Sequence, residues 1–132
     1  MVRAPTCLLI ACVLALAACG ENDEEQVNQT VRDFVTATSE RDEKRFCDEL
    51  VSQEFLEQST GAKGGKARDA CHTQLRQLKG LKVELEEIES TKVDDERATV
   101  RAVLSTQGQK QDQVLRLRKE DGDWKLAGGS GG

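Results

Sequence analysis

The sequence predicts an α+β domain in which three N-terminal helices pack on one face of an antiparallel sheet of about four strands. Before Gly80, apolar residues recur every three or four positions, which is the period of a helix with one buried face. After Gly80, apolar and polar residues alternate, as in a half-buried strand. Asp121-Gly122 is the dipeptide typical of a tight hairpin turn. Helices followed by a run of strands indicate a layered α+β fold.

The first helix is expected over residues 23–40. Asn22 is a suitable N-cap, and the acidic residues that follow it interact favourably with the positive end of the helix dipole. The apolar residues form a single stripe, at Val27, Val31, Phe34, Val35 and Thr38. This stripe predicts that one face of the helix is buried.

Two shorter helices are expected next. Asp42 can cap a second helix, whose inward residues are Phe46, Cys47, Leu50 and Val51, and a further helical turn carries Phe55 and Leu56. Residues 59–65 have the composition of a loop. The third helix then has inward positions Ala67, Ala70, Cys71, Gln74, Leu75 and Leu78. Gly80 is expected to end it.

Four strands are expected after Gly80. Alternating segments cover residues 81–86, 98–105 and 113–118, and Trp124 with Leu126 would form the inner face of a short fourth strand. The Gly- and Ser-rich end, residues 128–132, is expected to be a flexible tail. The folded domain is therefore predicted to cover residues 23–127.

The N-terminal segment has the pattern of an export signal. Arg3 precedes an apolar run of about 12 residues, which is too short for a bilayer-spanning helix of about 20 residues. Leu16-Ala17-Ala18-Cys19 resembles the lipobox of bacterial lipoproteins. That resemblance implies a signal peptide at residues 1–18, a lipid on Cys19, a short tether at residues 19–22 and a location at the outer face of the cytoplasmic membrane. Ordinary secretory cleavage and an uncleaved anchor are the alternatives.

Charge and cysteine content limit the partners of the domain. The net charge is −5, and acidic and basic residues are interspersed, so nucleic acid is not an expected partner. Outside the signal segment and Cys19, the remaining cysteines are Cys47 and Cys71. In an oxidising compartment an even pair favours a disulfide, with two buried free thiols as the alternative. These cysteines and the single His72 are too few for a tetrahedral metal site, and no cofactor is expected.

The order of elements and the ending Lys119-Glu120-Asp121-Gly122-Asp123-Trp124-Lys125-Leu126 resemble the NTF2-like (SnoaL-like, DUF4878-like) superfamily, in particular its small actinobacterial lipoproteins. The resemblance covers nearly all of residues 23–127. It implies a cystatin-like cone, in which the helices and a curved sheet enclose a pocket. The residues expected to line this pocket are Phe34, Val100, Leu115 and Trp124.

Two functions are consistent with this resemblance. The favoured one is a non-catalytic lipoprotein whose domain binds a small apolar ligand or a protein partner. The alternative is an enzyme similar to the SnoaL-like and steroid isomerases, with Asp33 or His72 as the acid-base group in the cone. The chain departs from those enzymes because it has no tyrosine and a single histidine. By helical phase, His72 and Asp33 are expected on the surface, and no catalytic residue is assigned.

A basic strip is predicted on the outer sheet face, at Arg101, Arg116, Arg118 and Lys125. Glu84 and Glu86 would share that face on the first strand. The first interpretation is cross-strand pairing of opposite charges, worth about 0.2–1 kcal/mol per pair. The second is a docking surface for an acidic partner.

Overall fold

Within residues 19–131, all helices precede the strands. The computed structural model describes residues 19–131, so the predicted signal peptide at residues 1–18 and the terminal Gly132 lie outside the described residues. The helical elements are α1 (Cys19–Glu40), the π-helical turn η1 (Arg45–Leu50), α2 (Gln53–Thr60) and α3 (Gly65–Gln77). The strands are β1 (Val83–Asp94), β2 (Arg97–Thr106), β3 (Gln109–Glu120) and β4 (Asp123–Gly131). The predicted α+β fold class is confirmed.

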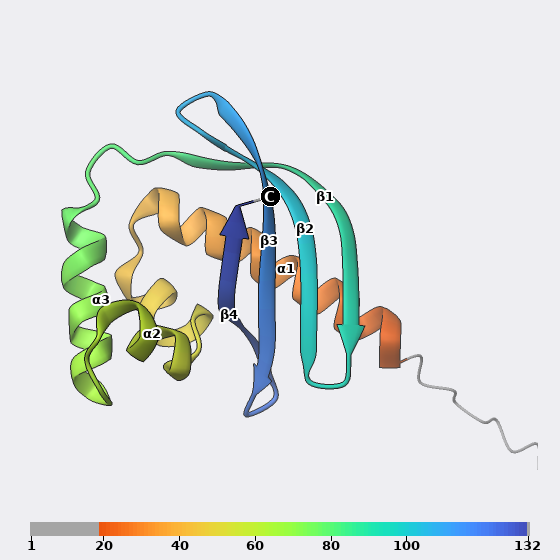
Figure 1. Cartoon of the computed structure of the whole chain (residues 1–132), viewed down its shortest axis with the longest axis horizontal. Helices are drawn as coiled ribbons and strands as arrows, with labels where there is room; N and C mark the ends of the chain where they lie inside the picture. The colour runs from red at the N-terminus through yellow and green to blue at the C-terminus, as the bar shows by residue number, and fades with distance from the viewer. Residues whose placement is uncertain (1–18, 132) are drawn as a thin grey trace, which may run out of the picture.

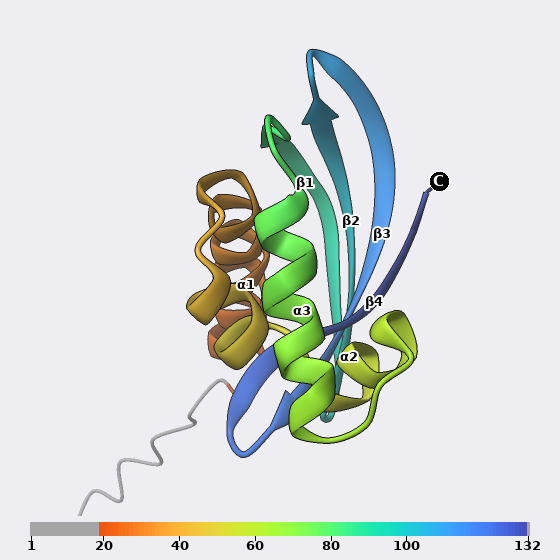
Figure 2. The ribbon, with the colours of Figure 1, turned by 90° about the vertical axis from the view of Figure 1, so that its left-hand side faces the viewer.

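The four strands form one antiparallel meander in the order β1-β2-β3-β4. Figure 1 shows α1 crossing the sheet, and Figure 2 shows α1 and α3 on one side of its curved surface. The strands are longer than predicted because two-residue turns join them. At the predicted turn, Asp121 and Gly122 have φ values of 51° and 84°, as a type I′ turn requires. Gln107-Gly108 forms a similar turn, which the sequence did not indicate because glutamine is not a usual residue there.

The predicted second helix is divided by two extended residues, Val51 and Ser52. Val51 forms a parallel bridge with Leu126 of β4, and the Ser52 amide donates a hydrogen bond to the Leu126 carbonyl over 2.9 Å. The Ser52 hydroxyl then accepts a hydrogen bond from the Phe55 amide and caps α2. The division therefore attaches the helical layer to the edge of β4.

Helix α1 begins at Cys19, so the residues expected to be a tether, 19–22, belong to the helix. Helix α3 buries Ala67, Cys71 and Leu75, as predicted. The expectation that Gln74 and Leu78 are also buried was wrong, because both are exposed. The reason is that α3 packs mainly on α2 and η1, so only one narrow stripe of α3 is covered.

The C-terminal segment also differs from the prediction. Gly128 to Gly131 were expected to be a flexible tail, but they belong to β4 and pair with residues Gln113 to Arg116 of β3. Strand pairing uses only backbone groups, so the length of β3 provides a partner even where β4 consists almost entirely of glycine. A register shift marks where this glycine segment starts, between the pairs of Arg116 and Leu117.

Candidate functional site

The space between α1 and the sheet, where the cone pocket was predicted, is occupied by apolar side chains. Val27 and Val31 of α1 belong to one buried cluster with Val100, Leu115 and Trp124 of the sheet. Val27, Val31 and Val100 have no solvent-exposed surface. Phe34, the remaining predicted pocket residue, is partly buried and packs against this cluster and against a second one around the cysteines. The four residues thus form part of the core.

A different hollow lies between η1, α2 and α3. Its volume is about 190 Å³. Its lining is mostly apolar and consists of Phe46, Val51, Phe55, Leu56, Ser59, Thr60, Cys71, Gln74, Leu75 and Leu78. Leu78, at the end of α3, is 45 % exposed. We refer to this feature as the helical hollow.

A disulfide, a change of chain direction and a side-chain hydrogen bond shape the walls of the helical hollow. Cys47 of η1 and Cys71 of α3 form a disulfide with a Cα–Cα distance of 5.9 Å, which confirms the predicted pairing. The extended residues Val51 and Ser52 change the chain direction, so that α2 begins beside the disulfide. At the rim, the Thr60 hydroxyl donates a hydrogen bond to the Leu56 carbonyl. A mainly apolar hollow with a few polar groups at its rim is the usual form of a small-molecule site.

His72 lies on α3 between two carboxylates. Its Nδ1 is 3.3 Å from Oε1 of Glu43, and its Nε2 is 3.0 Å from Oδ1 of Asp48. The hydrogen bond with Asp48 is the main cause that raises the pKa of His72; Glu43 adds to it, and partial burial opposes it. Arg68 and Arg76 contact the same two carboxylates. Both ring nitrogens are therefore engaged, and His72 is not among the residues that line the helical hollow.

Asp33 is also paired. Its Oδ2 lies 3.0 Å from an Nη atom of Arg45, and its Oδ1 accepts a hydrogen bond from the Gln29 side chain over 2.9 Å. A general base must reach the proton of a substrate. Asp33 instead joins α1 to η1 and does not line the helical hollow.

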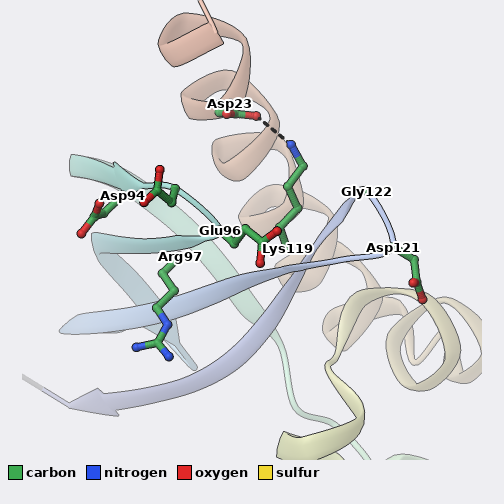
Figure 3. Close-up of a pocket in the computed structure, with 8 residues that line it drawn as sticks. Asp23, Asp94, Glu96, Arg97, Lys119, Asp121 and Gly122 are labelled. Carbon is green, nitrogen blue, oxygen red and sulfur yellow. Dashed lines mark hydrogen bonds and ion pairs between the residues drawn. The ribbon is translucent and has the colours of Figure 1, made fainter.

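A broad charged hollow lies at the start of α1, beside two hairpin turns (Figure 3). Its charged lining residues are Asp23, Asp94, Asp95, Glu96, Arg97, Lys119 and Asp121. Lys119 Nζ is 3.3 Å from Asp23 Oδ1 and 5.7 Å from the ring centroid of Trp124. This lysine thereby links α1 to the sheet, and Figure 3 shows Arg97 directed away from it.

Within residues 19–131, no group of three or more His, Cys, Asp or Glu side chains is arranged to hold a metal ion. The same part of the chain contains no helix that combines the length and apolarity needed to cross a bilayer. The helical hollow therefore remains the candidate site of the described residues.

The prediction that Glu84 and Glu86 pair with the basic strip on the outer sheet face was wrong. Glu84 contacts Lys82 and Glu86 contacts Lys110, because the register places both glutamates toward the far end of the sheet, where Glu84 faces Ser105. Arg118 pairs with Glu54 of α2 instead.

Sequence reasoning missed the helical hollow because its walls come from three helices whose contacts are set by tertiary packing. One signal was present in the sequence. Leu78 is a large apolar residue at the end of the expected third helix, two positions before Gly80. Few neighbouring residues can bury a side chain at a helix end, so an exposed apolar surface could be expected there.

Comparison with solved structures identifies the fold. A cystatin-like domain of unknown function from Nostoc punctiforme is similar, with a TM-score of 0.59, 20 % identity, and coverage of 83 % of this chain and 76 % of that one. An NTF-2-like protein of unknown function from Silicibacter pomeroyi has a TM-score of 0.57 and 12 % identity, covering 85 % and 98 %. A candidate scytalone dehydratase from Novosphingobium aromaticivorans has a TM-score of 0.53 and 18 % identity, covering 80 % of each chain.

These similarities confirm the NTF2-like, cystatin-like fold that the sequence resemblance implied. Protein-family models and curated protein sequences gave no match to the chain. Because one fold of this type hosts unrelated activities, the function must be argued from the site itself.

Proposed function

We propose that the chain is an exported lipoprotein, anchored through Cys19 at the outer face of the cytoplasmic membrane, whose domain binds a small apolar ligand without catalysing a reaction. The observation that carries the proposal is the helical hollow, whose lining consists mostly of apolar side chains. The anchoring part rests on the lipobox-like Leu16-Ala17-Ala18-Cys19.

The volume of the helical hollow limits the ligand. A dry apolar cavity of about 150 Å³ is large enough to bind benzene, whereas sites for drug-sized molecules are usually about 300 Å³ or more. A hollow of about 190 Å³ therefore fits a single ring or a short alkyl chain. The exposed Leu78 extends the apolar surface beyond the rim, where a longer chain could continue.

The arrangement of ionisable groups supports a binding role. An acid-base catalyst needs a positioned group that can exchange a proton with the substrate. The lining of the helical hollow carries hydroxyl, amide and disulfide groups but no carboxylate or imidazole. The two groups considered as catalysts, Asp33 and His72, are held in ion pairs outside it.

The binding of p-cresol, a single apolar ring with one hydroxyl group, tests the proposed site. Titration followed by NMR should shift resonances of Phe46, Phe55 and Leu75, which line the helical hollow. The variant Gln74→Trp places a large ring at the rim and should weaken binding at least about tenfold, which corresponds to ~1.4 kcal/mol.

The matched control is Gln77→Trp, on an exposed position of the same helix that does not line the hollow. It should leave the affinity nearly unchanged. Equal affinity of both variants and the parent chain would contradict the proposed site. Chemical conversion of the bound ring would contradict the non-catalytic role.

A further inference from the structure

The open edge of the sheet is the last part of β4. Strand β4 pairs with β3 on one side, and on its other side the described residues provide only the bridge from Val51 to Leu126. Residues Gly128 to Gly131 therefore have no strand partner on that side within residues 19–131. Figure 2 shows this end of β4 lying away from the helices. Backbone groups along such an edge are free to pair with another chain.

The opposite edge of the sheet is built differently. Strand β1 has two register irregularities, between Leu85 and Glu87 and between Ile88 and Ser90. Irregularities of this kind interrupt the regular row of backbone groups and are a common protection of edge strands. The glycine segment of β4 pairs with β3 in a regular register from Gly128 to Gly131. It is thus the edge that is suited to strand addition.

Positive charge lies on the outer sheet face beside this edge. Arg116 of β3 faces Gly128 of β4, and Arg101 of β2 faces Val114, whose partner on the other side is Ser130. Both arginines are exposed, and the described ion pairs include none for either of them. Two positive charges therefore lie on the strands next to the glycine segment.

Arg116 brings this charge to the glycine segment itself. It faces Gly128, and a Cβ placed on Gly128 would lie 2.8 Å from an Arg116 Nη atom. The guanidinium consequently lies over the backbone of β4, at the place where a side chain of β4 would otherwise be. A strand added beyond β4 would be about 4.8 Å away, within reach of this guanidinium.

We propose that Gly128 to Gly131 accept an extended acidic segment of a partner protein as a fifth strand, with a carboxylate of that segment paired to Arg116. The backbone of the segment satisfies the free amide and carbonyl groups, and its alternate side chains lie on the basic face. Successive side chains on one face of a strand are about 6.8 Å apart, so further carboxylates lie along the same face. A polypeptide fits this edge because strand pairing requires regularly spaced backbone amides.

A synthetic peptide tests the proposal with the full chain unchanged. The probe is fluorescein-Thr-Glu-Val-Glu-Val-Glu-Thr-amide, followed by fluorescence anisotropy. Two further versions carry N-methyl groups on either the odd or the even residues, so that each version blocks one edge of the peptide. Strand addition predicts that one version loses binding at least about tenfold while the other retains it. The two N-methylated versions carry the same charge. Equal binding of both would overturn the proposal, because the peptide would then be held by its charge and not by backbone pairing with β4.

The role of Arg116 is tested by Arg116→Gln, with Arg32→Gln on the exposed face of α1 as the matched control for charge. Arg116→Gln should weaken binding of the unmodified peptide by ~2- to 5-fold more than the control, in the range expected for an exposed ion pair. Equal effects of the two variants would overturn the pairing. Sedimentation without peptide provides a further test. A dimer that the peptide dissociates would show that a second copy of the chain occupies the edge, and the acidic-partner proposal would then be wrong.

Discussion

Asp48 and His72 directly follow the two cysteines of the disulfide, and their side chains contact each other, with Asp48 Oδ1 lying 3.0 Å from His72 Nε2. The segments of η1 and α3 are thus joined twice at neighbouring positions, once by a covalent bond and once by an ion pair. Helix α3 contacts few other elements, so these two links hold one wall of the helical hollow in place.

The ion pair predicts that stability depends on pH. The pKa of His72 is raised in the folded chain, chiefly by Asp48, so the folded state binds the proton more strongly than the unfolded state does. This contribution to the free energy of unfolding is fully present below the unfolded pKa of about 6.5 and is lost as the pH rises through the higher, folded pKa. Thermal unfolding should therefore give a lower Tm at pH 8.5 than at pH 6. In the variant His72→Gln, the decrease in Tm between pH 6 and pH 8.5 should be smaller. If the decrease in Tm were the same as in the parent chain, His72 would not be its cause.

The disulfide should contribute a large part of the stability. Replacing both Cys47 and Cys71 by alanine removes a cross-link between residues 24 positions apart, which is worth ~3.5 kcal/mol in the chain-entropy model. Urea unfolding of the double variant and of the oxidised parent should show a loss of this order. Intact mass before and after reduction and alkylation checks the bond itself, and two freely alkylated thiols in the native protein would contradict it.

The filled core should not tolerate a larger side chain. Val100 is completely buried between α1 and the sheet. Val100→Trp should therefore lower the free energy of unfolding by ~1–3 kcal/mol or more, because the added ring overpacks the core. Thr99→Trp is the control, because Thr99 is the next residue along β2 and is exposed. Its effect should stay within about 0.5 kcal/mol. Similar denaturant midpoints for the two variants would mean that the core has room for a ring.

Lipidation of Cys19 is tested by Cys19→Ala. Two acyl chains are needed for stable anchoring, so loss of the acceptor should transfer the protein from the membrane fraction to the medium or leave it as an uncleaved precursor. Fractionation of cells, with mass spectrometry of the mature N-terminus, measures the outcome. Unmodified mature protein in the soluble fraction of cells that express the parent sequence would contradict the anchor.

Local patterns in the sequence were sufficient to predict the fold class. The stripe of Val27, Val31 and Val35 and the turn at Asp121-Gly122 depend on spacing and backbone preference, which neighbouring residues determine. The break at Ser52 could not be predicted, because its cause is pairing with Leu126, which lies far away in the sequence.

The candidate site was less predictable than the fold. Cys47 and Cys71 could be paired from composition and helical phase, because both lie on buried stripes. The pocket was expected around Val100 and Trp124, but whether a cone is open or filled depends on how closely α1 approaches the sheet. That distance is a property of side-chain packing across the whole core and is not encoded in any one segment.

The meander order of the strands has a consequence for assembly of the domain. Each strand pairs with the next one in the chain through a two-residue turn, so the sheet forms by closing short loops at low entropic cost. The bridge between Val51 and Leu126 instead closes a loop of many residues and requires the last strand. We therefore expect the sheet to form early during folding and the helical layer to dock late, once the C-terminal strand has paired.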